Sequence, residues 1–189
     1  MRVIAGKFRS RKLATPPGVT TRPTSDRLRE TLFNVLAPAL ADTVFLDLYA
    51  GSGAVGIEAL SRGARQVYFA ESDRKAARAI RDNLKSLRLE EGVELLEREV
   101  MPAVRLLDAQ AVRCDIVFLD PPYGAHGAYE QVLGFLSQSR LLHAETIVIA
   151  EHDKHFDPGN TMGALARYRT LKQGDAVLSF YRLAATSHD

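Results

Sequence analysis

The sequence predicts an α/β fold with a seven-stranded, mostly parallel sheet, helices on both faces and a C-terminal antiparallel hairpin. From residue 43 onward, apolar runs of four or five residues alternate with longer segments of helical periodicity. Near-continuous apolar strands separated by helices are typical of a parallel sheet covered on both faces. Close to the C-terminus, the segments 167–171 and 177–181 flank Gln173-Gly174-Asp175, and this pattern predicts a β-hairpin that closes the sheet.

Length and composition limit the chain to one globular domain with a short arm. Its 189 residues are 46 % hydrophobic and 25 % charged, which excludes a disordered chain, a collagen-like chain and a small disulfide scaffold. No apolar run is long enough for a transmembrane helix, and the N-terminus lacks the apolar segment of a secretory signal. The single Cys114 cannot form an intramolecular disulfide, in keeping with a reducing compartment. We therefore expect a cytoplasmic monomer that makes no membrane contact.

The first 20 residues are expected to form a basic arm or hairpin, and residues 21–189 the main domain. Thr15-Pro16-Pro17-Gly18 interrupts the chain between them, as Pro and Gly clusters do. Eight of the first 30 residues are Lys or Arg and two are acidic, so the rest of the chain, whose overall net charge is +2, is net acidic. A basic arm on an acidic body indicates either contact with nucleic acid or a segment that serves only solubility. The candidate RNA-binding residues are Arg2, Lys7, Arg9, Arg11, Lys12 and Arg22.

The individual elements follow from periodicity and capping residues. A helix is expected after Arg22-Pro23, with Thr24 or Ser25 as its N-cap, because Leu28, Leu32, Val35 and Leu36 recur at helical spacing. The clearest helix runs from 73 to about 87, with Ser72 as N-cap and one apolar stripe. The expected parallel strands are 44–47, 66–70, 93–96, 115–119 and 146–150, and the hairpin strands are 167–171 and 177–181.

A glycine-rich turn follows the first of these strands. Gly51, Gly53 and Gly56 have the spacing GxGxxG, which lets backbone approach a ligand closely. This spacing alone fits a nicotinamide or flavin dinucleotide, another adenosine-containing cofactor, or a purely structural turn. Asp47 lies at the strand end, four residues before Gly51, where a carboxylate suits an ammonium group and repels a pyrophosphate.

A second carboxylate points to the ribose of the same cofactor. Glu71 ends the second strand, 20 residues after Gly51, the distance at which an acidic residue binds ribose hydroxyls in nucleotide-binding folds. A ligand with an ammonium group, a ribose and no phosphate is S-adenosylmethionine.

The tetrapeptide Asp120-Pro121-Pro122-Tyr123 directly follows the fourth strand. It therefore lies at the carboxyl edge of the sheet, where open α/β folds bind ligands. The Asp120 carboxylate and the Pro121 carbonyl are two acceptors for an exocyclic amino group, and Tyr123 offers a ring on which a base stacks. The alternative is a proline-rich turn with a packed tyrosine.

These residues resemble the Rossmann-like class I S-adenosylmethionine-dependent methyltransferases. More narrowly, the chain resembles, nearly from end to end, the bacterial family that methylates guanine N2 in 16S ribosomal RNA (the RsmD family). The Asp120–Tyr123 tetrapeptide also occurs in relatives that act on adenine N6, cytosine N4 or a protein glutamine amide. The segment that narrows the match is Thr21-Arg22-Pro23-Thr24-Ser25-Asp26-Arg27-Leu28-Arg29-Glu30-Thr31-Leu32-Phe33-Asn34, together with the basic start Arg2-Val3-Ile4-Ala5-Gly6-Lys7.

The resemblance implies a site. Residues 21–189 form the methyltransferase domain. The basic arm binds RNA phosphates, and the cofactor pocket is expected to close without it. The catalytic residues are Asp120, Pro121, Pro122 and Tyr123. The cofactor-binding residues are Asp47, Tyr49, Ala50, Gly51, Ser52, Gly53, Glu71, Ser72, Glu99 and Val100, with either Glu99 or the Val100 backbone at the adenine.

The expected reaction transfers a methyl group from S-adenosylmethionine to N2 of a guanine in 16S ribosomal RNA and leaves S-adenosylhomocysteine. The expected partner is 16S ribosomal RNA within a 30S subunit or an assembly intermediate. One alternative is another N-methyltransferase of this fold, acting on DNA adenine or a protein amide. A more distant one is a nicotinamide-dependent oxidoreductase built on the glycine-rich turn.

Two other groups of residues are expected to be structural. Cys114 lies at the start of the fourth strand, away from the ligand-binding edge, so a buried core thiol is favoured over a nucleophile. His152, Asp153, His155 and Asp157 lack regular ligand spacing, and we expect a solvated loop and no metal.

Overall fold

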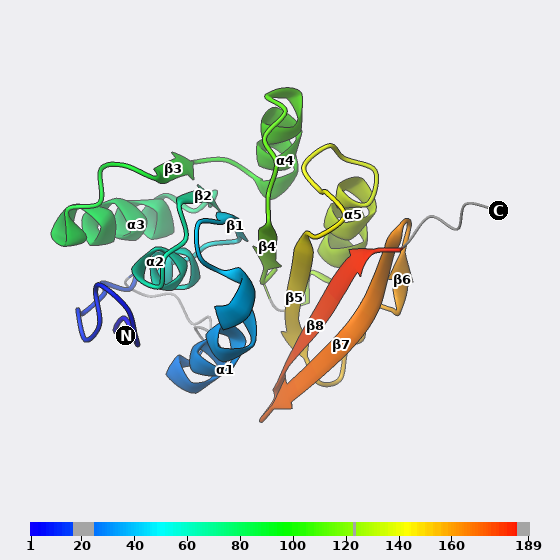
Figure 1. Cartoon of the computed structure of the whole chain (residues 1–189), viewed down its shortest axis with the longest axis horizontal. Coiled ribbons are helices and arrows are strands. Elements are labelled where there is room, and N and C mark those ends of the chain that lie inside the picture. Colours follow the sequence, from blue (N-terminus) through cyan, green and yellow to red (C-terminus); the bar gives the residue numbers. More distant parts are fainter. Residues whose placement is uncertain (17–24, 123, 185–189) are drawn as a thin grey trace.

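The computed structural model describes residues 1–16, 25–122 and 124–184, and within them all named strands belong to one mixed sheet (Figure 1). The strand order is β3-β2-β1-β4-β5-β8-β7-β6. The five strands β1 to β5 are mutually parallel, and the last three are antiparallel. The strands are β1 Val44–Leu48, β2 Gln66–Ala70, β3 Val93–Leu96, β4 Ile116–Leu119, β5 Ile147–Asp153, β6 Thr161–Met162, β7 Leu165–Gln173 and β8 Ala176–Leu183.

The α/β class, the parallel strands and the C-terminal hairpin are confirmed, but the expected number of seven strands is wrong. The described part of the chain has an eighth strand, β6, in which Thr161 and Met162 pair with Ala166 and Leu165. A two-residue strand is too short to produce any hydropathy pattern. β1 lies between β2 and β4: the chain runs from β1 outward to β2 and β3 on one side, then crosses back to β4 on the other side. This reversal is the point at which open α/β sheets bind ligands.

The helices cover both faces of the sheet, as expected (Figure 1). One buried cluster joins the sheet to α1, α2 and α3, and a second joins the opposite face to α4 and α5. The bounds are α1 Asp26–Leu36, the short 3-10 helix Ala37–Ala39, α2 Ala54–Ser61, α3 Arg74–Leu87, α4 Val100–Ala109 and α5 His126–Leu136. Among these helices, none has the length and apolar composition needed to cross a membrane.

The capping residues differ in one case from the expected ones. Ser25 caps α1, where its side chain accepts a hydrogen bond from the N–H of Leu28; Thr24 lies outside the described residues. The N-cap of α3 is Asp73 rather than Ser72, because the Asp73 carboxylate accepts hydrogen bonds from the N–H groups of Lys75 and Ala76. A carboxylate at this position also interacts favourably with the positive end of the helix dipole.

Part of the expected histidine loop is strand. His152 and Asp153 are the last two residues of β5, and only His155 and Asp157 follow it, so the expected solvated loop begins two residues later. His152 is buried and its Nε2 lies 2.9 Å from Ser179 Oγ; burial lowers the pKa of this histidine. Among the described residues, no group of three His, Cys, Asp or Glu side chains is arranged to hold a metal ion.

Cys114 belongs to the core, as expected. Its side chain is buried in the cluster that α4 and α5 cover. Burial raises the pKa of the Cys114 thiol to about 12, so a nucleophilic thiolate is strongly disfavoured.

Residues 1–16 form a docked hairpin, which we call the N-terminal hairpin. Arg2 and Lys12 form an antiparallel bridge, and Val3 and Leu13 are buried in the core cluster beside α1, α2 and α3. The boundary between arm and domain near residue 20 falls outside the described residues and stays a prediction.

A buried carboxylate holds the N-terminal hairpin to the sheet domain. Glu58 of α2 is completely buried and accepts hydrogen bonds from the N–H groups of Ile4 and Ala5, at 2.8 and 3.0 Å. Its charge is balanced by Arg62 at 2.7 Å and by the buried Arg29, whose Nε lies 3.8 Å away. Arg29 in turn donates to the carbonyl of Arg2 at 2.6 Å. Helix, hairpin and charge pair therefore depend on one another.

We predict that Glu58→Ala lowers the free energy of unfolding by about 3–5 kcal/mol. The variant leaves the buried Arg29 with only the partly exposed Asp26 as counter-charge, and it removes the acceptor of the Ile4 and Ala5 N–H groups. Urea denaturation measures the change. Glu30→Ala, an exposed position on α1, is the matched control and should stay within about 0.5 kcal/mol of the parent. A Glu58→Ala protein as stable as this control would contradict the role assigned to the buried carboxylate.

Candidate active site

A cavity of about 490 Å³ lies at the carboxyl ends of the parallel strands. It has the volume of a small-molecule site and the position expected for one in an open α/β sheet. The N-terminal hairpin, the glycine-rich turn and the strand ends all contribute to its wall. The lining residues are Met1, Thr15, Pro16, Asp47, Tyr49, Ala50, Gly51, Ser52, Ala54, Val55, Glu71, Ser72, Asp73, Ala76, Glu99, Phe118, Asp120, Pro121, Pro122 and Glu151.

Two glycines of the turn are required by geometry. Gly53 is the N-cap of α2 and has φ of 75°, a conformation that favours glycine. At Gly56, a Cβ atom would lie 2.3 Å from the Phe69 ring, so only glycine lets α2 approach β2 this closely. Gly51 lines the cavity, whereas Gly53 does not. Gly51 is therefore a candidate ligand contact, whereas Gly53 and Gly56 shape the turn and the packing of α2.

Asp47 is buried at the end of β1 and faces the cavity. Its Oδ2 accepts a hydrogen bond from the N–H of Gly56 at 2.9 Å, which ties the strand end to the first turn of α2. Burial raises the pKa of Asp47 to about 8, with a smaller contribution from the charge of Glu71. A positively charged ligand group beside Asp47 would oppose this shift and favour the carboxylate.

Glu71 holds the glycine-rich turn from the end of β2. One carboxylate oxygen accepts from the N–H of Gly51 and the other from the N–H of Asp73, both at 2.8 Å. A carboxylate has about four acceptor positions, so both oxygens still have capacity for ligand hydroxyl groups. The structure therefore brings Glu71, the candidate ribose acceptor, into contact with the glycine-rich turn.

Of the two residues expected near the adenine, Glu99 and Val100, only Glu99 is in the cavity wall. Glu99 lines the cavity, whereas Val100 is buried as the first residue of α4 and does not line it. Tyr49, Ala50, Ser52 and Ser72 line the cavity as expected.

The tetrapeptide after β4 faces the same cavity. Asp120, Pro121 and Pro122 line it, and Tyr123 lies outside the described residues. The pKa of Asp120 is raised well above its ordinary value, first by burial and then by the charges of Glu151 and Asp47. The carboxyl groups of Asp47, Asp120 and Glu151 are thus concentrated on three neighbouring strands, near the end of β1, directly after β4 and within β5.

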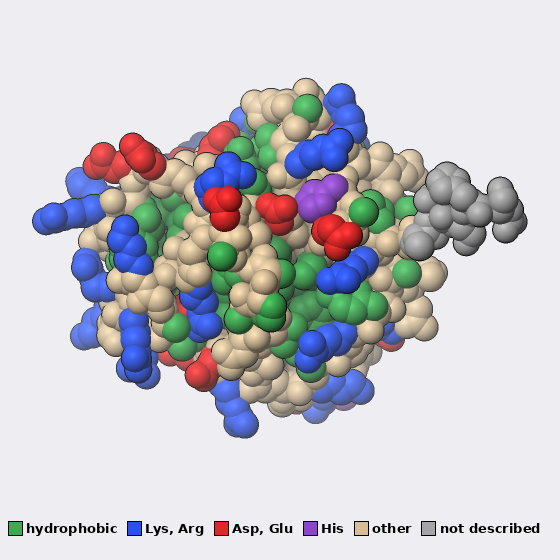
Figure 2. All heavy atoms as spheres, in the orientation of Figure 1, with side chains coloured by type: hydrophobic (Ala, Val, Ile, Leu, Met, Phe, Trp, Pro, Cys, Tyr) green, Lys and Arg blue, Asp and Glu red, His purple; other side chains and the backbone are tan. Residues whose placement is uncertain are grey.

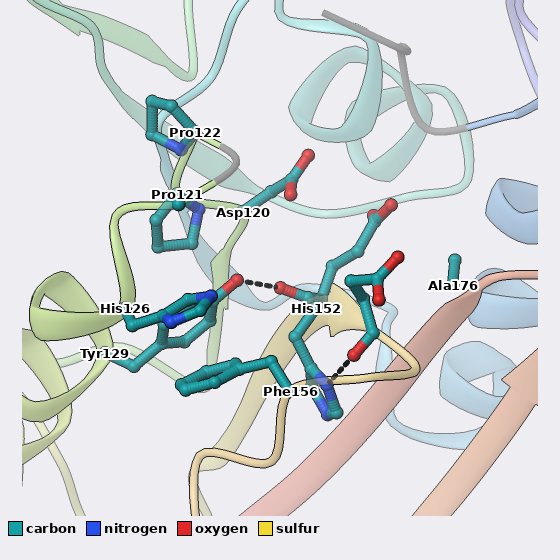
Figure 3. A pocket seen from close by; sticks show the side chains of 11 residues that line it. Asp120, Pro121, Pro122, His126, Tyr129, His152, Phe156 and Ala176 are labelled. Carbon is teal, nitrogen blue, oxygen red and sulfur yellow. Dashed lines mark hydrogen bonds between the residues drawn. The ribbon is translucent and has the colours of Figure 1, made fainter.

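A second cavity of about 30 Å³ also has Asp120 in its wall (Figure 3). The rings of His126 and Phe156 are stacked there, with centroids 4.1 Å apart and an interplanar angle of 8°. Tyr129 lies beside Phe156 and donates its hydroxyl to the carbonyl of Glu151 at 2.7 Å. Asp120 and Glu151 line both cavities, so these carboxyl groups connect the two spaces.

The expectation that the arm is not needed for the cofactor pocket is wrong. Met1, Thr15 and Pro16 form part of the cavity wall. Asn83 of α3 binds both the N–H and the carbonyl of Ala14 and donates to the carbonyl of Ser52 in the glycine-rich turn, at 2.7, 3.0 and 3.0 Å. The N-terminal hairpin is therefore joined to the turn through one amide side chain, and no local sequence signal identifies this contact.

Five of the six candidate RNA-binding residues are exposed on the N-terminal hairpin, namely Arg2, Lys7, Arg9, Arg11 and Lys12; Arg22 lies outside the described residues. Lys and Arg side chains gather on the side of the molecule formed by this hairpin and α3 (Figure 2). A second basic group, which the sequence analysis missed, lies on the C-terminal hairpin. There the Arg182 guanidinium lies 4.8 Å from the centroid of the Tyr168 ring. Among the described residues, Tyr168 is the large hydrophobic side chain that is exposed to solvent. Both groups carry the kind of side chain that contacts nucleic acid.

Comparison with known proteins gives a consistent result. The family model described as Conserved hypothetical protein 95 matches residues 1–182. A Haemophilus influenzae protein named ribosomal RNA small subunit methyltransferase D is 37 % identical over 155 residues, or 82 % of this chain and 79 % of the relative. The Escherichia coli K12 protein of the same name is 37 % identical over 153 residues, covering 81 % of this chain and 75 % of the relative.

Solved structures confirm the Rossmann-like methyltransferase fold. An Escherichia coli structure described as "Putative methyltransferase yhhF" superposes with a TM-score of 0.84 at 32 % identity and covers 98 % of this chain and 99 % of that one.

The sequence analysis missed Glu151 as a residue of the cavity, although a signal for it was available. This acidic residue directly follows the apolar run 146–150, at the ligand-binding edge of the sheet.

We predict that Asp47 makes the ligand-free protein less stable as pH rises from about 4 to 8. Folding raises its pKa from 3.8 to about 8, so the folded state retains a proton that the unfolded chain has lost. Stability then falls by at most about 1.4 kcal/mol per pH unit and is constant above the folded pKa.

Asp47→Asn removes this titration and keeps an oxygen for the N–H of Gly56. Urea unfolding at several pH values between 4 and 9 measures the difference between the two proteins. We expect the stability of the parent relative to Asp47→Asn to decrease with pH. Parallel pH profiles would show that Asp47 is already ionised in the ligand-free fold.

Proposed function

The chain belongs to the family described as Conserved hypothetical protein 95, and from this membership we propose that it transfers a methyl group from S-adenosylmethionine to the exocyclic N2 of a guanine in 16S ribosomal RNA. The observation that carries this proposal is the concentration of carboxyl groups between the glycine-rich turn and the Asp120-Pro121-Pro122 segment. The relatives named ribosomal RNA small subunit methyltransferase D support the RNA substrate.

The electrostatics of the cavity favour this cofactor over a dinucleotide. Asp47 is buried and Asp120 is partly buried, and both carboxyl groups have raised pKa values. A cation in the cavity opposes these shifts and gains two carboxylates as counter-charges, whereas a pyrophosphate raises the pKa values further and gains no counter-charge. S-adenosylmethionine carries a sulfonium and an ammonium group. Asp47 would face the ammonium group and Glu71 the ribose hydroxyls, beside the turn that Glu71 holds. This argument disfavours a nicotinamide-dependent oxidoreductase.

The side chains after β4 prepare the nucleophile. The cofactor supplies a methyl group on a positively charged sulfur. An amino group on an aromatic ring is a weak nucleophile, because its lone pair is delocalised into the ring. The Asp120 carboxylate and the Pro121 carbonyl can accept hydrogen bonds from the two N–H groups of this amino group and so direct its lone pair toward the methyl group. The nitrogen–carbon bond forms as the carbon–sulfur bond breaks, and the amine proton leaves to Asp120 or to water.

Positioning supplies most of the rate in such a reaction, because amine, methyl carbon and sulfur must lie in line. Tyr123, outside the described residues, stays predicted to stack on the base. The target guanine has to be unpaired or extruded to reach Asp120. The basic residues of the N-terminal hairpin would bind phosphates and make the affinity dependent on salt.

The direct experiment compares 16S ribosomal RNA from cells with and without this protein by mass spectrometry. We expect one N2-methylguanosine to be absent without the protein and to be restored by purified protein and S-adenosylmethionine acting on 16S RNA or 30S particles. DNA and a protein bearing a glutamine amide are the alternative substrates. Methylation of either one, with no change in the RNA, would contradict the proposal.

We predict that Asp120→Ala lowers the single-turnover rate of methyl transfer by about 10²–10³-fold, because a charged hydrogen bond in a desolvated site is lost. Asp120→Asn keeps the shape and one acceptor oxygen and should retain more activity than Asp120→Ala. Both variants should bind S-adenosylhomocysteine nearly as the parent does, which calorimetry checks. An Asp120→Ala enzyme within threefold of the parent rate would mean that the amine is activated by another group.

A further inference from the structure

Glu151 occupies the position next to Asp120 on the neighbouring strand. Leu119, the last residue of β4, pairs with Ala150 of β5 in parallel register. Asp120 and Glu151 each follow one residue later, and neighbouring strands lie about 4.8 Å apart. Both side chains line both cavities, and the charge of Glu151 contributes to the raised pKa of Asp120. The two carboxyl groups thus face one small volume.

The backbone around Glu151 is held firmly. The Tyr129 hydroxyl donates to its carbonyl at 2.7 Å, and the next residue, His152, lies 2.9 Å from Ser179 Oγ. The side chain is 8 % exposed. Figure 3 shows the aromatic rings of His126, Tyr129 and Phe156 gathered on one side of the small cavity, with Asp120 and Pro121 on the other. The nearly buried Glu151 therefore lies within a paired strand, and its position beside Asp120 is fixed by the register of β4 and β5.

The bases differ in the atom beside their amino group. In guanine, N2 is attached to C2, which lies between N1 and the bare acceptor N3. On the Watson–Crick edge, the neighbour of the amino group is N1, which carries a hydrogen. In adenine the ring nitrogen beside the amino group is the bare acceptor N1, and in cytosine it is the bare acceptor N3. A carboxylate placed beside the amino group on the Watson–Crick edge therefore gains a hydrogen bond from guanine and meets a lone pair in adenine or cytosine. Two adjacent carboxyl groups match the two adjacent donors of guanine.

We propose that Glu151 accepts the ring N1–H of the target guanine while Asp120 holds its N2 amino group, so that Glu151 selects guanine over the other amino-bearing bases. This assignment rests on the proposed function. It requires Glu151 to accept one further donor, which a carboxylate can do alongside other partners because it has about four acceptor positions.

The test replaces the target guanine with 2-aminopurine, in 16S RNA that is ligated from two pieces and assembled into small-subunit particles. This base keeps the N2 amino group and has a bare acceptor at N1. The target position is the one found by mass spectrometry. Single-turnover methyl transfer is measured for the parent and for Glu151→Gln, whose amide N–H can donate to the bare nitrogen.

We expect the parent to prefer guanine over 2-aminopurine by about 10–100-fold, the discrimination that a specific base contact provides. In Glu151→Gln this preference should fall at least about tenfold, because the amide serves either base. The loss of the guanine O6 in 2-aminopurine affects both enzymes equally, so the change in the ratio isolates the contact between residue 151 and N1.

The control is Glu130→Gln, an exposed carboxylate of α5 that lines neither cavity, and it should keep the parent ratio. Thermal unfolding and S-adenosylhomocysteine binding verify that Glu151→Gln is folded. Equal parent rates on guanine and 2-aminopurine would overturn the assignment without any variant, and so would an unchanged ratio in Glu151→Gln. A parent enzyme that methylates no guanine in the particle would instead refute the proposed function.

Discussion

The site depends on the burial of several carboxyl groups at one edge of the sheet. Asp47 lies near the end of β1, Asp120 directly after β4 and Glu151 within β5 beside Asp120. The pKa values of Asp47 and Asp120 are raised by burial and by neighbouring carboxylates, Glu71 for Asp47 and Glu151 with Asp47 for Asp120. Such groups are costly to the ligand-free protein. A cationic ligand turns the same arrangement into a favourable one, since it supplies the missing counter-charge. The buried carboxyl groups thus lower the stability of the ligand-free protein and favour binding of a positively charged cofactor and an amino-bearing base.

The N-terminal hairpin gives the cavity its second wall and links two parts of the proposed activity. Its backbone is held by the buried Glu58, and Asn83 joins it to the glycine-rich turn. The same segment exposes the basic side chains proposed to bind RNA. Disturbance of the hairpin is therefore expected to affect cofactor and RNA together, which differs from the behaviour of a detachable basic arm.

Much of the fold and part of the site could be predicted from the sequence, because their signals are local. β2 and β3 match the expected runs in full, and Asp47, Glu71 and Asp120 were identified from their positions after apolar strands. The N-terminal hairpin could not be placed, because its contacts with Glu58 and Asn83 join residues more than 50 positions apart. The N-cap of α3 depends on which of two neighbouring polar side chains turns toward the helix. Glu151 was overlooked although it follows the same strand-end rule as Asp120.

The most direct measurement of the cavity's preference is calorimetric titration of the protein with S-adenosylmethionine, S-adenosylhomocysteine and NADH. We expect the two adenosyl ligands to bind and NADH, which carries a pyrophosphate, to show no measurable binding. Tight binding of NADH together with no binding of the adenosyl ligands would contradict the view that the carboxyl groups of this cavity are arranged for a cationic nucleoside.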